Sequence, residues 1–252
     1  MPQRILSLVP SITELLFDLG MAERVIGITK FCVHPASWYR SKTRIGGTKN
    51  PHIDQIRKLR PDLILANKEE NREADIRELE KDFPVWISDV PTVDAALEMI
   101  QSIGNLTGSG KQAAEICQQF LQEKQDWLFW QQAQHIPALR TLYLIWKEPY
   151  MTVGNDTFIH AMLELAGARP VITQARRYPV LNTEAILAMQ PECVLLSSEP
   201  YPFQTKDQQE IQSLLPNARV ELVDGEMFSW YGSRMIAAPG YFRKRWEDSK
   251  RA

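Results

Sequence analysis

Two twelve-residue stretches of the chain, 54–65 and 184–195, align with each other without a gap. Each begins with an acid, Asp54 or Glu184, seven positions before a proline, and each continues with a second acid and an apolar run. The pattern predicts a helix that ends before the proline and a buried strand after it. Because such a connection is common in α/β proteins, convergence remains an alternative to duplication. We interpret the pair as a duplicated half, which divides the 252 residues into two similar units.

The first residues predict a parallel α/β unit. Residues 5–9 form an apolar run that is closed by Pro10, and Ser11 and Glu14 have the spacing of a capping box. The helix that they predict ends at Gly20, and a second short strand follows at 25–28. Strand, helix and strand within about 25 residues are typical of a parallel sheet with crossover helices.

A long stretch without proline or glycine, 111–134, separates this unit from a second one whose first strand is predicted at 141–146. Its apolar residues lie mainly at helical spacing. A helix of that length would be about 35 Å long. The sequence therefore predicts an N-terminal α/β lobe at 1–108, a linking helix at 109–136 and a C-terminal α/β lobe at 137–252.

Composition excludes several classes of function. With 29 Lys and Arg against 31 Asp and Glu, the formal net charge is −2, which does not favour nucleic-acid binding. The three cysteines are scattered, the four histidines lack metal-site spacing, and no catalytic motif is present, so we predict no metal site and no enzyme. The first residues lack the pattern of a secretory signal, and no apolar run of about 18 residues occurs. A cytosolic protein and a trimmed or mature chain both fit.

Several motifs, in order, resemble those of the class III periplasmic binding proteins, which deliver cobalamin, haem or ferric siderophores to ABC importers. They are residues 7–14 followed by Gly20, 60–64, Gly154 with Asn155, and 165–168. The resemblance covers nearly the whole chain and is strongest to the cobalamin-binding branch. It implies two Rossmann-like α/β lobes bridged by a single rigid helix, with a ligand cleft between the lobes, and we expect a monomer. It also implies the periplasm or cell envelope, whereas the missing export signal favours the cytoplasm.

The loops after the predicted strands supply aromatic and polar side chains for a large, flat ligand. The candidate ligand-binding residues are Phe31, His34, Asn67, Lys68, Met151, Tyr178, Trp230, Tyr231 and Arg234. The resemblance places Phe31, Met151 and Tyr178 where the cobalamin-binding branch has aromatic or apolar contacts. Asn67 and Thr48 stand where that branch often has tryptophan, which predicts a more polar surface on the first lobe.

Other aromatic and histidine side chains have competing interpretations. Trp86 and Trp146 lie inside apolar strands and are predicted to be core residues. His34 lies on the first candidate loop, where it would face a cobalt or haem iron axially; the alternative is a loop histidine hydrogen-bonded to the backbone. His160 is predicted to be structural.

The function predicted from these features is reversible binding of a cobalamin-like corrinoid or another metal chelate, without a catalytic cofactor, for delivery to an ABC importer. A haem or ferric-siderophore receptor is an alternative, in which Arg176, Arg177 and Arg234 would pair with ligand carboxylates. A cytosolic metal- or cofactor-handling protein or enzyme on the same scaffold is another. The resemblance further implies that Asp54 and Glu184 dock onto arginines of a permease dimer, although acids in a first helical turn also stabilise the helix.

Overall fold

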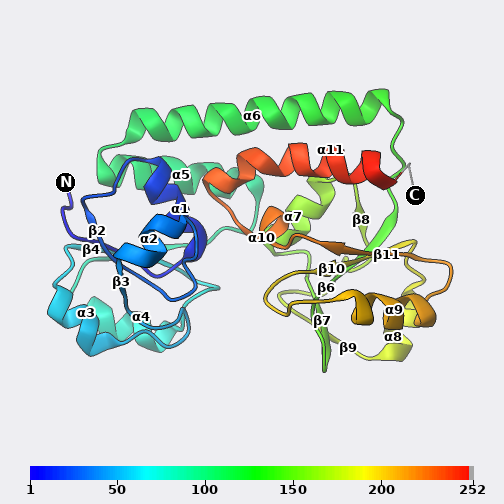
Figure 1. The fold of residues 1–252 in the computed structure, drawn as a ribbon, viewed down its shortest axis with the longest axis horizontal. Coiled ribbons are helices and arrows are strands. Elements are labelled where there is room, and N and C mark those ends of the chain that lie inside the picture. Colours follow the sequence, from blue (N-terminus) through cyan, green and yellow to red (C-terminus); the bar gives the residue numbers. More distant parts are fainter. Residues whose placement is uncertain (250–252) are drawn as a thin grey trace. The chain divides into compact units, whose positions relative to one another are not determined.

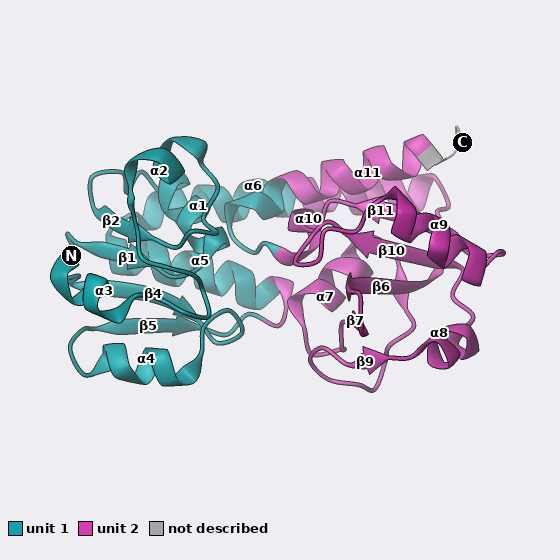
Figure 2. Cartoon of the chain, turned by 60° about the horizontal axis from the view of Figure 1, so that its bottom comes forward, with its two compact units in different colours: residues 1–90, 94–122, 230–236 teal, residues 91–93, 123–229, 237–252 magenta. Residues whose placement is uncertain are grey.

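The computed structural model describes residues 1–249, and the chain divides into two units (Figure 2). The first unit comprises residues 1–90, 94–122 and 230–236, and the second comprises 91–93, 123–229 and the chain from 237 onward. Each unit contains one β-sheet with helices around it (Figure 1). The predicted α/β fold class, with two sheets in one chain, is confirmed.

The sheet of the first unit is wholly parallel and has the strand order β3-β2-β1-β4-β5. Its elements, in chain order, are β1 (Ile5–Ser7), α1 (Pro10–Asp18), β2 (Val25–Ile28), α2 (Ala36–Ser41), β3 (Thr43–Arg44), α3 (Ile53–Leu59), β4 (Leu63–Asn67), α4 (Glu73–Glu80), β5 (Val85–Ser88) and α5 (Val93–Thr107). The central strands β1 and β4 are buried along their whole length, as expected for a parallel sheet covered on both faces. Leu6 of β1, Leu8 just after it and Ile64 of β4 pack with Ile56 of α3 and Ile76 of α4 in one apolar core.

The sheet of the second unit is mixed, with the order β11-β10-β6-β7-β9 and β8 paired to β6. Strands β11, β10 and β6 are parallel, whereas β7 runs antiparallel to both β6 and β9. The elements are β6 (Arg140–Trp146), β7 (Tyr150–Thr152), α7 (Phe158–Leu165), β8 (Arg169–Pro170), β9 (Val180–Leu181), α8 (Thr183–Met189), β10 (Cys193–Ser197), α9 (Thr205–Leu214), β11 (Arg219–Val223), α10 (Glu226–Ser229), the 3₁₀ helix η1 (Ser233–Ala237) and α11 (Ala238–Ser249).

Helix α6 (Gly110–Ala133) is one continuous helix of 24 residues, close to the predicted range. Residues up to 122 belong to the first unit and residues from 123 to the second, so the helix is shared by both units. Within residues 1–249 no helix combines the length and the apolar character needed to cross a membrane.

The segment 230–236 belongs to the first unit, although the sequence assigned it to the C-terminal lobe. Gly232, with φ of +107°, brings the backbone of this segment against α1. A Cβ atom on Gly232 would lie 3.4 Å from the Cβ of Leu15 and 3.4 Å from the carbonyl oxygen of Ser11. The positive φ and this close approach both favour glycine.

The two repeated stretches have the same local structure. Helices α3 and α8 each have seven residues, and each ends at a residue with φ of +45°, Arg60 or Gln190, before the proline. Arg4 donates from a guanidinium nitrogen to the carbonyl of Leu59 at the end of α3, and Arg140 donates in the same way to the carbonyl of Met189 at the end of α8. The equivalence thus extends beyond the aligned residues and supports duplication.

The predicted capping box at the start of α1 is wrong. The helix begins at Pro10, its N-cap is Val9, and no side chain caps it. Proline suits the first helical position because the backbone N–H of that position makes no hydrogen bond within a helix, so its absence costs nothing. The Glu14 carboxylate is instead part of the candidate site described below.

Candidate functional site

The loop that follows β2 in the first unit is fixed by a buried thiol. The Sγ of Cys32 lies 3.1 Å from the hydroxyl oxygens of both Thr13 and Thr29, and Thr13 also donates to Ser7 at 2.8 Å. Burial raises the pKa of the Cys32 thiol, with these hydrogen bonds acting in the opposite direction. Cys32 is therefore a neutral anchor that holds the loop on the core.

The residues on either side of this anchor project outward. Phe31 is 51% exposed and Val33 is also exposed, whereas Cys32 between them is fully buried. The Phe31 ring lies over Gly47, where a Cβ atom would be 3.2 Å from its Cε2, and Lys30 Nζ lies 5.0 Å from its centroid. The loop thus presents two apolar side chains from a rigid base.

His34, the next residue of interest in this loop, contacts Trp230 from the far end of the chain. The two ring centroids are 5.5 Å apart in an edge-on arrangement. The guanidinium carbon of Arg234 lies 5.0 Å from the Trp230 ring centroid. Trp230 is buried, with 8% of its surface exposed, and its ring is packed against the side chains of His34 and Arg234.

A carboxylate on α1 orients Arg234. Its Nε donates to Glu14 Oε2 at 2.7 Å and its Nη2 donates to Glu14 Oε1, which makes a two-pronged contact. Both side chains are more than four-fifths buried. Such a charged pair has defined geometry, because the planar guanidinium matches the carboxylate. The sequence did not identify Glu14 as a member of this group.

Two predicted contact residues of the first unit have other partners. Asn67 is buried; its Nδ2 donates to Ser88, and its Oδ1 accepts from the backbone N–H groups of Glu69 and Glu70. The side chain holds the turn after β4 and offers almost no surface, so the structure does not support its prediction as a ligand contact. Lys68 is exposed, and its Nζ donates to Asp89 at 2.6 Å.

In the second unit the predicted residues Met151 and Tyr178 lie near one another. Met151 of β7 is paired directly with Val180 of β9, and Pro179 accepts a hydrogen bond from the backbone N–H of Thr152. Val180 is 59% exposed, so the antiparallel pair presents an apolar side chain that the sequence analysis did not single out. Tyr178 immediately precedes this pair and is half-buried.

The loop that carries Tyr178 is fixed by the Gly154 segment. The N–H of Gly154 donates to the Arg177 carbonyl at 2.6 Å, and the N–H of Asn155 donates to the Ala175 carbonyl at 3.0 Å. A Cβ atom on Gly154 would lie 2.6 Å from the Ala175 oxygen, so only glycine allows this approach. The family motif Gly154–Asn155 therefore supports the Tyr178 loop.

The hairpin that carries Met151 is fixed by an ionic cluster. Lys147 Nζ contacts Asp207 Oδ1 at 2.8 Å and Glu210 Oε2 at 2.7 Å, and the Tyr150 hydroxyl donates to Glu210 at 2.9 Å. Burial opposes ionisation of Asp207, but the hydrogen bonds from Lys147 and the Gln204 backbone lower the pKa of this carboxyl overall. The same lysine and Tyr150 lower the pKa of Glu210, and burial together with Glu210 raises the pKa of Tyr150 to about 12.

The remaining predictions have mixed outcomes. Trp146, predicted to be core, is 39% exposed at the end of β6 and packs edge-on against Tyr201 at 5.8 Å. Tyr231 is buried. His160 is buried on α7, with Nε2 3.7 Å from Glu164. Within residues 1–249, no group of three acidic, histidine or cysteine side chains is arranged to hold a metal ion.

The two predicted docking acids occupy equivalent positions. Asp54 and Glu184 are both the second residue of their helix and both exposed. Asn182 caps α8 by accepting from the N–H of Ala185, and neither acid makes a side-chain capping bond. The two acids therefore do not cap their helices through a hydrogen bond. They can stabilise them only through the attraction between a first-turn carboxylate and the helix dipole.

Comparisons with known proteins agree with this architecture. The family model described as periplasmic binding protein matches residues 5–217. The chain therefore belongs to the periplasmic binding protein family, which confirms the resemblance seen in the sequence motifs.

Individual relatives are distant but extend over most of the chain. A vitamin B12-binding protein of Pectobacterium atrosepticum (strain SCRI 1043) is 25% identical over 243 residues, which cover 94% of this chain and 86% of that protein. An ABC transporter substrate-binding lipoprotein of Bacillus subtilis (strain 168), described as uncharacterized, is 24% identical and covers 93% of this chain and 77% of its own length.

Solved structures of similar fold include two periplasmic proteins. The vitamin B12 binding protein of Vibrio cholerae has a TM-score of 0.80 at 19% identity and covers 100% of this chain and 99% of its own. A haem binding protein of Pseudomonas aeruginosa has a TM-score of 0.86 at 20% identity, and the match covers 99% of this chain and 94% of that protein. At these identities the likeness establishes the fold.

Proposed function

We propose that this protein is the substrate-binding component of an ABC importer and that it binds a cobalamin-like corrinoid reversibly, without a catalytic step. Family membership and the names of relatives such as the Pectobacterium protein support the class of function. The observation that carries the choice of ligand is the exposed Phe31 beside the His34–Trp230 pair, on a loop fixed by Cys32. A flat chelate with apolar faces needs such rigid aromatic surfaces.

The second unit supplies surfaces of the same kind. Met151 and Val180 are side by side on the β7–β9 pair, and Tyr178 adds an aromatic ring next to them. Their supports, Gly154 and Lys147, fix the backbone in advance, which lowers the entropy lost on binding. That the ligand lies between the two units remains a prediction from the family resemblance.

A haem receptor is the second candidate. The fold of the Pseudomonas haem binding protein and the exposed Arg176 and Arg177 favour it, because guanidinium groups pair well with propionate carboxylates. Arg234 is less suited to that role, since Glu14 already occupies its Nε and Nη2. His34 would supply an imidazole to the metal in either candidate.

A ligand panel distinguishes these candidates. Cobalamin, haem, a ferric siderophore and divalent metal ions are each titrated while fluorescence of the seven tryptophans is recorded. We expect saturable quenching by a corrinoid at one per chain. Saturation by haem alone would overturn the corrinoid proposal and leave the transport proposal standing, whereas no saturation by any chelate would overturn both.

The role of His34 has a spectroscopic test. We expect His34→Gln to change the absorption bands of a bound aquocorrinoid or haem if the imidazole is an axial ligand, and His52→Gln, on another loop, to leave them unchanged. Identical spectra for the parent and His34→Gln would assign His34 to supporting Trp230 alone.

We further propose that the partner is a permease dimer and that Asp54 and Glu184 form the docking contacts. Two exposed acids at equivalent helix positions support this, because separated charges set orientation and association rate.

A further inference from the structure

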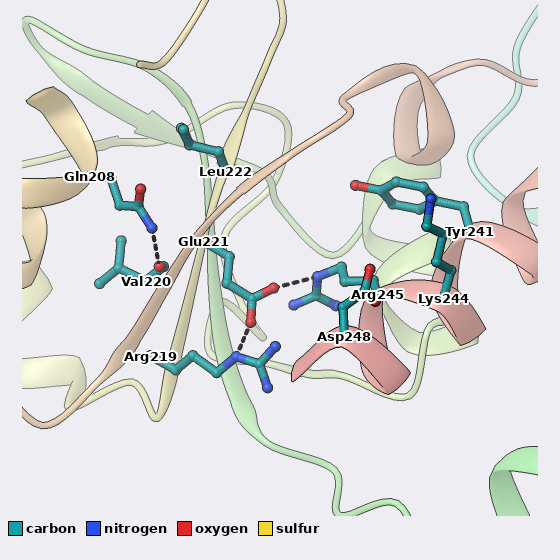
Figure 3. Close-up of a pocket in the computed structure, with 9 residues that line it drawn as sticks. All are labelled: Gln208, Arg219, Val220, Glu221, Leu222, Tyr241, Lys244, Arg245 and Asp248. Atoms are coloured by element: carbon teal, nitrogen blue, oxygen red, sulfur yellow. Dashed lines mark hydrogen bonds and ion pairs between the residues drawn. The ribbon is translucent and has the colours of Figure 1, made fainter. Parts of the chain in front are cut away.

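A pocket of about 810 Å³ lies in the second unit, on the edge strand β11 and helix α11 (Figure 3). It is separate from the Met151–Tyr178 surface, which is built on β7 and β9. The residues that line it are Gln208, Arg219, Val220, Glu221, Leu222, Tyr241, Lys244, Arg245 and Asp248. Nothing in the proposed transport function uses these residues.

The centre of the pocket is a carboxylate shared by two arginines. Arg245 Nε lies 2.6 Å from Glu221 Oε2, and Arg219 Nε contacts Glu221 Oε1. Both contacts are ion pairs in which Glu221 is the counter-ion of the two arginines, and Glu221 Oε1 and Arg245 Nε are buried.

In each ion pair the guanidinium atom that contacts Glu221 is Nε (Figure 3). One terminal nitrogen of Arg245 is 3.9 Å from the sulfur of Cys193, and those of Arg219 make no hydrogen bond within residues 1–249. Planar donor forks of this kind are the preferred protein partners of phosphate and carboxylate oxygens.

The formal charges in the pocket do not cancel. Arg219, Lys244 and Arg245 give +3, and Glu221 and Asp248 give −2, which leaves +1. Burial, and then the charge of Arg245, lower the pKa of Arg219, so the like charges are held close at an energetic cost. An anion between them would remove this repulsion.

We propose that this pocket binds a phosphate group, held by the terminal nitrogens of Arg219 and Arg245, while Lys244 adds positive charge to the same pocket. Phosphate is favoured over a carboxylate because it carries more negative charge and three acceptor oxygens, so it can accept from two guanidinium groups at once. The group belongs to a free phosphate, a soluble phosphate ester or a lipid headgroup, and the exposed Leu222 beside the pocket is compatible with an acyl or glycerol neighbour.

Calorimetric titration with inorganic phosphate, at an ionic strength held constant with chloride, tests the proposal on the intact protein. We expect one saturable site per chain. Arg245→Gln should weaken binding by about tenfold or more, because one charge-assisted hydrogen-bonding group is lost. Arg243→Gln is the matched control: Arg243 lies on the same helix, pairs with Glu247 and packs on Trp130, outside the pocket. Saturation that is equal in Arg245→Gln and the parent would overturn the proposal, as would the absence of saturation.

Glu221→Gln is expected to change phosphate affinity in the opposite direction to Arg245→Gln. A folding defect would weaken binding in both variants, so the pair of variants separates the two explanations. Removing the internal carboxylate leaves both arginines without a counter-ion, so phosphate should bind about tenfold more tightly than to the parent. Weaker phosphate binding to a folded Glu221→Gln variant, shown by an unchanged circular dichroism spectrum, would contradict the proposed role of the pocket.

Three further titrations identify the source of the phosphate. Glycerol phosphate, vesicles of phosphatidylcholine with phosphatidylglycerol, and vesicles of phosphatidylcholine alone are compared, each with the parent and with Arg245→Gln. Binding to the anionic vesicles that Arg245→Gln removes assigns a lipid headgroup, and stronger binding of the soluble ester assigns a small metabolite. If inorganic phosphate binds more tightly than both glycerol phosphate and the anionic vesicles, the site is assigned to the free ion. Corrinoid titration of the same variants should be unchanged, which keeps failure of this proposal separate from failure of the transport proposal.

Discussion

Arg234 and Glu14 lie 220 positions apart in the chain and form a two-pronged ion pair that supports one side of Trp230. The pair joins α1 to the 3₁₀ helix η1 within the first unit. Because both side chains are largely buried, removing either charge leaves the other with an incomplete set of partners.

The first prediction concerns this pair. Glu14→Gln should lower the free energy of unfolding by about 1–3 kcal/mol, because the buried guanidinium loses a charged acceptor. Glu23→Gln, at an exposed acid in the turn before β2, should change it by less than about 0.5 kcal/mol. Urea unfolding measures both, and equal values for the two variants would show that the pair does not support the fold.

The same substitution has a consequence for the ligand. If Arg234 positions Trp230, Glu14→Gln should weaken corrinoid binding several-fold without removing any group that we place in direct contact. An affinity equal to that of the parent, in a folded variant, would restrict the pair to a structural role.

The second prediction concerns Phe31. Phe31→Ala should weaken chelate binding by about 1–3 kcal/mol, because an aromatic surface on a fixed loop is lost. Its effect on unfolding should be small, since about half of the side chain is exposed. Phe129→Ala is the control, because Phe129 is 75% exposed on α6 and lies outside the proposed contacts. Equal chelate affinities of the two variants would remove Phe31 from the site.

Features that depend on a local sequence pattern could be predicted from the sequence. The α3–β4 and α8–β10 repeats, the strands β1, β2 and β6, and helix α6 were predictable because their patterns are local: apolar runs, a proline after a helix, and 24 residues without a helix breaker. The Phe31 loop was predictable for the same reason, since it follows an apolar strand.

Residues whose role depends on distant partners were not predictable. Glu14 has the local spacing of a capping box, and only folding brings it to Arg234. Asn67 follows a strand like a ligand contact, but Ser88 and the next turn use all of its polar atoms. Val180 has no motif and becomes visible only through its pairing with Met151.

The third prediction concerns pH and the Lys147 cluster. Lys147 lowers the pKa values of Asp207 and Glu210, so these carboxyls bind protons less readily in the folded chain than in the unfolded chain. Their contribution to stability is therefore present above their ordinary values of 3.8 and 4.5 and is lost as the pH falls below them.

Lys147→Met should make unfolding less dependent on pH in that acidic range and should lower stability at neutral pH, where buried Asp207 loses its cation. Lys58→Met, at an exposed lysine of α3 in the first unit, is the control, because Lys58 lies outside the cluster. Urea unfolding at a series of pH values measures both. A pH profile of Lys147→Met that is parallel to that of the parent would contradict the role assigned to the cluster.

The fourth prediction concerns docking, and it uses the equivalence of α3 and α8. Asp54 is 92% exposed at its side chain and lies 3.6 Å from Arg57, which is itself held by Glu78 and Asp82. The equivalent of Arg57 in the second repeat is Leu187, an exposed apolar residue, so Glu184 lacks this basic neighbour at the equivalent position. We therefore expect Glu184→Asn to reduce the rate of association with the permease more than Asp54→Asn does, because Arg57 already offsets part of the Asp54 charge.

The double variant Asp54→Asn with Glu184→Asn should keep chelate affinity and stability and lose most transport, since asparagine is tolerated at a helix start and carries no charge. Asp94→Asn with Glu73→Gln is the matched control, because both acids are exposed in the first turns of α5 and α4. The association rate is measured by capturing the loaded protein on immobilised, reconstituted permease at two salt concentrations. Higher salt should lower the association rate of the parent and leave that of the double variant almost unchanged. Transport by the double variant at the rate of the parent would exclude the two acids as docking contacts, while the chelate titrations would still stand.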